Sequence, residues 1–171
     1  MKIISKLKLF SVIIASLMVF MAAKSFALKG NHKGVPSIGS MVIMSGLENP
    51  WDIAFTKDMK AMFFTEKLDG LSVLMGGKVH KLLGMKGSSG YADTHDDLFS
   101  YGAQEGMLGV VLDPDFDNNR TLYLYSTSSK YHGDGCKTNF ERCDGNIVMK
   151  FTVANDMKSV SDRVDIVKDI Q

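Results

Sequence analysis

Proline and cysteine are scarce in this chain of 171 residues, which contains three prolines and two cysteines. So little proline excludes a collagen-like or proline-rich chain. Basic residues exceed acidic ones by only one, and no basic patch interleaved with aromatic residues is present, so nucleic acid is not an expected partner. The sequence also lacks a G-x-S-x-G motif, a phosphate-binding glycine loop and paired catalytic carboxylates.

The first 27 residues have the pattern of a secretory signal peptide. Three lysines precede an uninterrupted apolar run from Leu9 to Ala23, and Ser25-Phe26-Ala27 forms a small-x-small cleavage site. The alternative is a retained membrane anchor, but the apolar run is shorter than the roughly 20 residues that a spanning helix needs. We therefore predict export to the periplasm or the exterior, cleavage after Ala27, and no stable membrane span thereafter. Residues 1–27 contain four lysines and no acid, so the chain without them has a formal net charge of −3 instead of +1.

Both cysteines flank one short polar loop, "CKTNFERC", between Cys136 and Cys143. In an exported chain this spacing predicts a disulfide that closes the loop, and free thiols are the alternative. The sequence does not have the C-x-x-C-H motif of a haem attachment site or the four cysteine and histidine ligands of a structural zinc site.

Residues 28–45 show no periodicity and are expected to form a flexible mature N-terminus. From residue 46 the chain alternates with the period of β-strands, and four short strands with tight connections are predicted between residues 51 and 84. The segment "LDG" is expected to form a tight turn in which Gly70 is able to take a positive φ, and the glycines at 76–77 are expected to form a hairpin turn. Trp51 begins an alternating apolar face and is expected to lie in the core.

Residues 84–103 are predicted to be a long loop without a strand, of the kind that is usually functional. Beyond this loop the sequence predicts four more strands. They are Met107–Leu112, Thr121–Thr127, Asn146–Val153 and Val164–Ile170. The polar segment 113–120 between the first two is predicted to be a turn, because its aspartates and asparagines can hydrogen-bond their own backbone.

The sequence pattern of the first set of strands recurs in the second set at a period of roughly 50 residues, which is typical of repeat proteins. Two four-stranded antiparallel units in tandem predict an all-β fold, a partial β-propeller of about two blades over residues 46–171. The alternative is a single eight-stranded sandwich or barrel. Two blades alone would leave strand edges and sheet faces open. The chain is therefore expected to be either the front part of a larger protein or a truncated relative that needs a partner.

Two clusters have metal-ligand residue types. His95 stands among three aspartates at 93, 96 and 97, but neighbours in one loop rarely converge on an ion, so a solvated acidic loop is expected. The segment "DPDFDNNRTLYL" starts like a calcium loop. It lacks the glycine at position 6 and has Leu124 where the bidentate glutamate should be, so a turn is predicted.

Two blocks of the sequence carry a family resemblance. The segments "GLENPWDIAFTKDMKAMFFTEKLDGLSVL" and "GAQEGMLGVVLDPDFDNNRTLYLYST" resemble the N-terminal region of the glucose/sorbosone dehydrogenases, the soluble quinoprotein aldose sugar dehydrogenases. The resemblance covers about residues 42–170. It implies an exported six-bladed β-propeller that uses pyrroloquinoline quinone (PQQ) and Ca²⁺ to oxidise an aldose or related polyol, with hydride transfer to the quinone and a histidine as the base.

The resemblance assigns one site residue in this chain. Gln104 stands where the family has a glutamine that reaches into the active-site mouth, with Ala103 and Glu105 in place of the flanking glycines. An uncharged amide suits a sugar hydroxyl or a quinone oxygen. The catalytic histidine of the family belongs to a later segment, expected beyond Gln171, so no catalytic or metal-ligating residue is assigned here.

Three hypotheses follow. The first is the N-terminal portion of a sugar dehydrogenase, inactive as the isolated chain, with an unidentified electron acceptor. The second is a non-catalytic module that uses its open blades to bind another chain or a second copy of itself, as a homo-oligomer. The third is a remnant that does not fold.

Overall fold

The computed structural model describes residues 38–100, 104–131 and 145–170, and the chain divides into two units, residues 1–45 and 46–171. In the first unit, residues 38–45 are almost all exposed. The signal peptide and the Cys136–Cys143 disulfide lie outside the described residues and stay predictions.

The first sheet of the second unit has the strand order β1-β2-β3-β4-β5. Its strands are β1 (Pro50–Phe55), β2 (Ala61–Glu66), β3 (Gly70–Met75), β4 (Lys78–Met85) and β5 (Asp93–His95). The first four pair antiparallel, which confirms the four predicted strands. The prediction of a strandless loop at 84–103 is wrong, because β5 pairs parallel with β4. Three residues are too few for alternation to be visible in the sequence.

Two of the predicted turns contain glycines, and both turns are present in the structure. Gly76 and Gly77 have φ of 56° and 75°, the values of a tight hairpin turn, which confirms the prediction. The tight turn before Gly70 is present, and Gly70 itself does not take a positive φ. A Cβ at Gly70 would lie 2.3 Å from the backbone oxygen of Leu83 and 2.8 Å from the ring of Tyr91. Glycine is needed there because neighbouring atoms approach closely, and the turn does not require it.

The second sheet has the strand order β6-β7-β8-β9, all antiparallel. Its strands are β6 (Met107–Leu112), β7 (Thr121–Ser128), β8 (Gly145–Val153) and β9 (Val160–Ile170). All four were predicted, although β9 begins four residues earlier than expected. The turn between β6 and β7 contains a short helix, α2 (Phe116–Asn119), which ends at Arg120 with φ of 55°.

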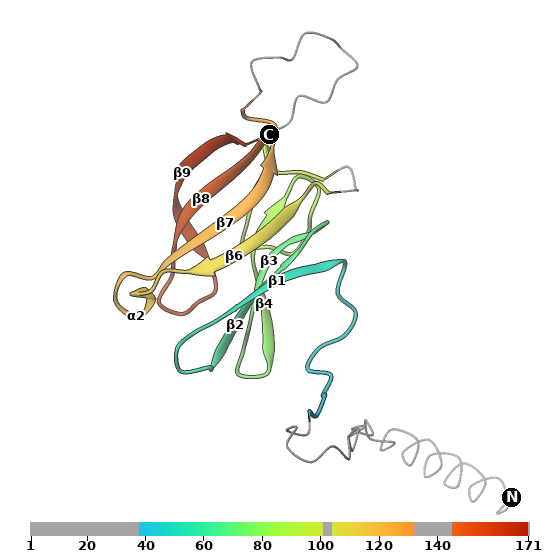
Figure 1. The fold of residues 1–171 in the computed structure, drawn as a ribbon, viewed down its shortest axis with the longest axis vertical. Helices are drawn as coiled ribbons and strands as arrows, with labels where there is room; N and C mark the ends of the chain where they lie inside the picture. The colour runs from blue at the N-terminus through green and yellow to red at the C-terminus, as the bar shows by residue number, and fades with distance from the viewer. Residues whose placement is uncertain (1–37, 101–103, 132–144, 171) are drawn as a thin grey trace, which may run out of the picture. The chain divides into compact units, whose positions relative to one another are not determined.

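The core lies between the two sheets, which Figure 1 shows as two layers of strands. Its fully buried side chains come from both sheets and α2; they include Phe63, Leu71, Val73, Phe116, Leu124, Met149 and Phe151. The ring of Phe63 meets that of Phe116 edge to face at 5.7 Å. Backbone contacts add to this packing, since the N–H of Met107 donates to the oxygen of Lys67 at 3.1 Å. The two sheets are thus two packed blades of a partial β-propeller.

The prediction for Trp51 is wrong. Trp51, Ile53 and Phe55 are 48%, 55% and 39% exposed. The alternate residues of β1 face the second sheet instead: Ala54 packs against the core, and the carboxylate of Asp52 accepts a hydrogen bond from the N–H of Val110 at 3.0 Å. The large side chains of β1 therefore lie on the face that the second sheet does not cover.

Candidate functional site

Gln104 is exposed and lies two residues before Gly106, whose backbone is tightly fixed. The oxygen of Gly106 accepts hydrogen bonds from the N–H of Thr127 and the hydroxyl of Ser126, each at 3.0 Å. Its N–H donates to the hydroxyl of Thr127 at 3.1 Å. Gly106 has φ of +130°, and a Cβ there would lie 2.0 Å from the oxygen of Lys67. The glycine required for close backbone approach is therefore Gly106, and it holds the base of the segment that carries Gln104.

Two further residues at this edge were not assigned by the sequence. Lys67 follows β2, and its backbone N–H donates to the oxygen of Asn49 at 2.9 Å while its oxygen accepts from Met107. The Lys67 ammonium lies 5.5 Å from the centre of the Trp51 ring. A β-bulge between Pro50 and Asp52 sets Trp51 out of the regular register. Lys67 thus contacts residues on both sides of it in the sequence, from Asn49 to Met107. The only sequence signal for these contacts is that Lys67 directly follows β2, whose pairing with β1 resembles the pairing of β6 with β7.

An amide, an ammonium and a half-exposed aromatic ring thus occur where β1 and β6 begin and β2 ends. We call Trp51, Lys67 and Gln104 the polar rim. The amide can donate to and accept from a hydroxyl, the ammonium donates, and the ring offers an apolar surface. These three groups could therefore bind a ligand that carries hydroxyl groups and an apolar face. The rim contains no group that could remove a proton from an alcohol near neutral pH.

His95 and the neighbouring acids form a structural network, and the prediction of a solvated acidic loop is wrong for Asp97. The two carboxylate oxygens of Asp97 accept from Arg163 of β9, each at 2.7 Å. Nδ1 of His95 lies 2.7 Å from the same guanidinium, so it is the acceptor, and Nε2 lies 3.3 Å from the Asp93 carboxylate. Among the residues that the structure describes, no group of three or more histidine, cysteine or acidic side chains could hold a metal ion.

This network continues to Asp165 and joins the two sheets. The Asp165 carboxylate accepts from Arg163 at 2.7 Å, from Lys130 at 2.8 Å and from the Tyr131 hydroxyl at 2.7 Å. Burial raises the pKa of Asp165, but these donors outweigh burial and lower it to about 2. Burial likewise opposes the lowered pKa of Asp97, where the Arg163 and Ser128 hydrogen bonds prevail. We call Asp97, Arg163 and Asp165 the cross-sheet ion network; its role is to fasten the sheets.

The segment from Asp113 to Tyr123 is the predicted turn. The Asp113 carboxylate accepts from the N–H of Asp115 and the amide of Asn119, each at 2.9 Å, and from the Tyr123 hydroxyl at 2.8 Å. These hydrogen bonds lower the pKa of Asp113, the one from Asp115 most. Because the turn itself occupies this carboxylate, the prediction of a turn is confirmed.

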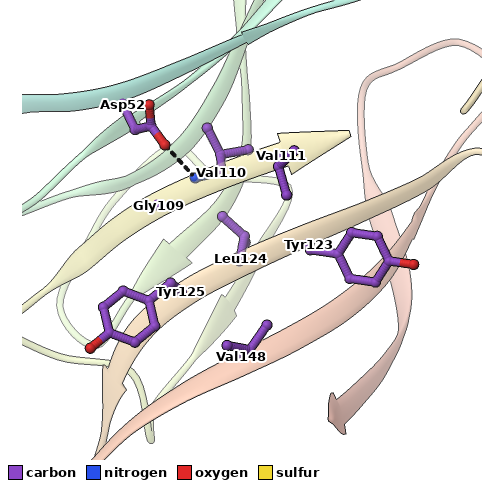
Figure 2. A pocket seen from close by; sticks show the side chains of 8 residues that line it. All are labelled: Asp52, Gly109, Val110, Val111, Tyr123, Leu124, Tyr125 and Val148. Atoms are coloured by element: carbon purple, nitrogen blue, oxygen red, sulfur yellow. Dashed lines mark hydrogen bonds between the residues drawn. The ribbon is translucent and has the colours of Figure 1, made fainter. Parts of the chain in front are cut away.

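A shallow hollow of about 350 Å³ lies over β6, β7 and β8, beside Asp52 of β1 (Figure 2). It is lined by Asp52, Gly109, Val110, Val111, Tyr123, Leu124, Tyr125 and Val148. Except for Asp52 and the two tyrosine hydroxyls these side chains are apolar. The hydroxyl of Tyr123 and the carboxylate of Asp52 already have the partners named above. The hollow therefore offers apolar surface more than hydrogen-bonding groups.

The chain is similar in sequence to sugar dehydrogenases. The family described as Glucose / Sorbosone dehydrogenase matches residues 47–171. The aldose sugar dehydrogenase YliI of Escherichia coli (strain K12) is 34% identical over 83 residues, which are 48% of this chain and 20% of that protein.

Solved structures show the same fold. The soluble aldose sugar dehydrogenase from Escherichia coli, in the apo-form, is 28% identical with a TM-score of 0.53, over 71% of this chain and 30% of that one. A PQQ-bound aldose sugar dehydrogenase from Streptomyces coelicolor is 14% identical with a TM-score of 0.52, over 75% of this chain and 32% of that one. The chain thus spans less than a third of the length of each of these proteins.

Proposed function

Because the chain belongs to the glucose/sorbosone dehydrogenase family, we propose that it is the N-terminal portion of an exported sugar dehydrogenase. The proposed reaction is oxidation of an aldose or related polyol, with hydride transfer to PQQ. The observation that carries the proposal is the family match over residues 47–171, which includes both packed sheets and the segment of Gln104.

The role proposed for these two blades is to bind the substrate through the polar rim. Gln104 would hydrogen-bond a sugar hydroxyl, and Gly106 would hold its segment in place through the backbone contacts with Thr127 and Lys67. Trp51 is 48% exposed and can present its ring to the apolar face of a sugar. The described residues do not form a binding site for PQQ or Ca²⁺. We therefore assign this chain a contribution to binding and no chemical step.

Export is the second part of the proposal. The signal-peptide pattern of residues 1–27 supports it. Within the described residues, the structure contains no helix that is both long and apolar enough to cross a membrane.

A chimera tests the proposed role directly. Residues 47–171 replace the matched segment of the Escherichia coli aldose sugar dehydrogenase, and PQQ-dependent oxidation of aldoses is measured with an artificial electron acceptor. We expect turnover by the chimera and none by the 171-residue chain alone with PQQ and Ca²⁺. Gln104→Ala in the chimera should lower kcat/KM about tenfold, since one hydrogen bond to a neutral group contributes about 1.4 kcal/mol at most.

Lys158→Ala is the matched control, because Lys158 is an exposed residue of the β8–β9 turn and should leave kcat/KM unchanged. A folded chimera, judged by circular dichroism and cooperative melting, that binds PQQ but does not oxidise any aldose would contradict the proposal. Sugar oxidation by the 171-residue chain alone would contradict the restriction of this chain to binding.

The apolar sheet faces that remain exposed favour a second candidate function, a non-catalytic module that binds another chain. Ile53, Val111 and Val164 are 55%, 57% and 47% exposed although they belong to regular strands. This candidate predicts that the chimera is inactive while the chain itself forms a stable complex.

A further inference from the structure

The first strand of each sheet contains a β-bulge, and the bulge of β1 carries a residue of the polar rim. Along β1 the cross-strand partners change from Pro50 with Glu66 to Asp52 with Thr65, so Trp51 is the extra residue. A bulge interrupts the ladder of backbone hydrogen bonds and turns a side chain in a new direction. The direction of the Trp51 ring therefore depends on how this bulge is held.

The bulge of β6 lies just after the segment of Gln104. Between Met107 and Val110, β6 has two residues opposite the single residue Tyr125 of β7. Met107 is the third residue after Gln104, so this bulge sets the angle at which the Gln104 segment leaves the sheet. Bulges occur more often than expected beside active sites, where they serve this purpose.

Two side chains of the first sheet join the two bulges. The fully buried hydroxyl of Thr65 accepts from the N–H of Asp52 at 3.2 Å and donates to the oxygen of Leu108 at 2.5 Å. The carboxylate of Asp52 accepts from the N–H of Val110 at 3.0 Å, as Figure 2 shows. The Leu108 oxygen and the Val110 N–H flank Gly109 within the bulge of β6. Hydrogen-bonding groups at one bulge are thus paired with groups at the other.

We infer that Asp52 and Thr65, which we call the bulge pair, are positioning residues of the polar rim. By tying the two bulges together they hold Trp51 and Gln104 at one separation and orientation. The ligand that such a fixed pair recognises is a hydroxylated ring that stacks on the indole while a hydroxyl group bonds the amide. This inference rests on the proposed function of the rim in binding sugar.

One other contact joins the sheets near these bulges, and it does not replace the bulge pair. The N–H of Met107 donates to the oxygen of Lys67 at 3.1 Å, just before the bulge of β6. A single contact leaves a strand free to turn about it, whereas a second contact further along the strand fixes its angle. The bulge pair supplies that second contact. Because Thr65 and Leu108 are buried, water does not compete for their hydrogen bond.

Threonine variants separate positioning from stability. Thr65→Val removes the hydroxyl and keeps the shape of the side chain, and Thr65→Ser keeps the hydroxyl. Thr56→Val is the matched control: Thr56 is 5% exposed, follows β1 at the end away from Trp51, and its hydroxyl bonds Asp58 and Ala61. Both valine variants remove a buried hydroxyl, so each should raise the equilibrium constant of unfolding about tenfold.

The first measurement needs no ligand. Residual dipolar couplings of the 171-residue chain give the orientation of the Trp51 indole N–H and the Gln104 backbone N–H relative to β7. Both orientations should change in Thr65→Val, return in Thr65→Ser and stay unchanged in Thr56→Val. Asp52→Asn, which replaces one acceptor oxygen by a donor, should change them too and serves if Thr65→Val does not fold. Unchanged orientations in a folded bulge-pair variant overturn the inference.

The second measurement uses the chimera with the Escherichia coli enzyme. Thr65→Val should raise KM for the aldose about tenfold, the effect of losing the Gln104 hydrogen bond, while kcat stays within about twofold. Thr56→Val should leave KM unchanged. In a chimera that already carries Trp51→Ala and Gln104→Ala, adding Thr65→Val should not raise KM further, because the bulge pair acts through those two side chains.

The outcomes distinguish this inference from the proposed function. If Thr65→Val leaves KM unchanged in an active chimera, or raises KM equally with and without the two rim side chains, the inference is overturned. If the chimera with all of these residues unchanged is inactive, the proposed function is contradicted, and the dipolar couplings still decide whether the bulge pair positions Trp51 and Gln104.

Discussion

The first strands of the two sheets, β1 and β6, have similar sequence patterns but bury different kinds of side chain. In β6 the larger residues Met107 and Val110 enter the core and Val111 is 57% exposed. In β1 the small or polar residues Asp52 and Ala54 face the second sheet, and the large residues remain on the outside. On both strands, apolar residues also lie on the side that the other sheet does not cover, with Ile53 on β1 and Val111 on β6. The packing of the two sheets thus buries one apolar layer, while Ile53 of β1 and Val111 of β6 on the opposite sides remain more than half exposed.

The largest difference in the free energy of unfolding is expected between removing a large side chain from the core and removing one from the uncovered side of β1. Phe63 is fully buried and contacts Phe116, so Phe63→Ala should lower the free energy of unfolding by about 3–5 kcal/mol. Phe55→Ala, on the side of β1 that the second sheet does not cover, should cost about 1 kcal/mol or less, because its side chain is 39% exposed. Urea titrations at one fixed chain concentration measure both values. Equal losses would mean that this side of β1 is as well covered as the core.

The next comparison is between the costs in stability of placing alanine at two glycines in or next to β6. Gly106→Ala should cost about 3 kcal/mol, because the new Cβ would meet the Lys67 oxygen at 2.0 Å and φ is +130°. Gly109→Ala should cost under about 1 kcal/mol, since the nearest atom to its Cβ is 3.4 Å away, on Tyr125. Thermal unfolding of the two variants tests this. If Gly109→Ala were the more destabilising, the backbone contact at Gly106 would not be what holds the Gln104 segment.

The cross-sheet ion network should contribute less to the free energy of unfolding than the core does, and more than an ion pair at the surface. Arg163→Met leaves the carboxylates of Asp97 and Asp165 without their shared partner and should cost about 3 kcal/mol. Lys60→Met removes a pair with Asp58 in which the side chains are 83% and 55% exposed, and should cost under about 0.5 kcal/mol. Urea unfolding at pH 7 compares them. Similar values would show that the network does not fasten the sheets.

The same network makes the free energy of unfolding depend on pH in the acid range. The pKa of Asp165 is lowered to about 2 from an ordinary 3.8, so its contribution is complete above about pH 4 and is lost as the pH falls towards 2. The unchanged chain should lose about 2 kcal/mol from this group over that interval. Asp165→Asn should be less stable at pH 7 and lose correspondingly less between pH 4 and 2. Parallel curves for the two proteins, measured by urea unfolding at each pH, would contradict this assignment.

The smallest effect on stability is expected at Trp51. Its contact with Lys67 is an exposed cation–π interaction worth about 0.5–1 kcal/mol, so Trp51→Ala should change the free energy of unfolding by about that much. If the polar rim binds sugar, the same substitution in the chimera should raise KM for the aldose while kcat stays within about twofold. A change confined to kcat would assign Trp51 a role other than binding.

Features set by neighbouring residues could be predicted from the sequence. The Gly76–Gly77 turn, the Asp113 turn and nearly all strand limits depend on local hydrogen bonds and period-2 alternation. The position of Gln104 came from the family resemblance, and its exposure is consistent with a site at the surface. Lys67 was missed because its contacts with Asn49, Trp51 and Met107 reach back 18 residues or forward 40, distances over which the sequence carries no local pattern.

The sequence by itself determined the eight longer strands, their tight turns, the repeat of two blades and the resemblance to the family. The tertiary structure alone decided which side of β1 is buried, the pairing of β5, the reason for glycine at Gly70, and the union of Asp97 with Arg163. The physical reason is the range of the interactions. Alternation marks two sides of a strand but does not say which side another sheet covers, because that depends on packing between residues far apart in the chain.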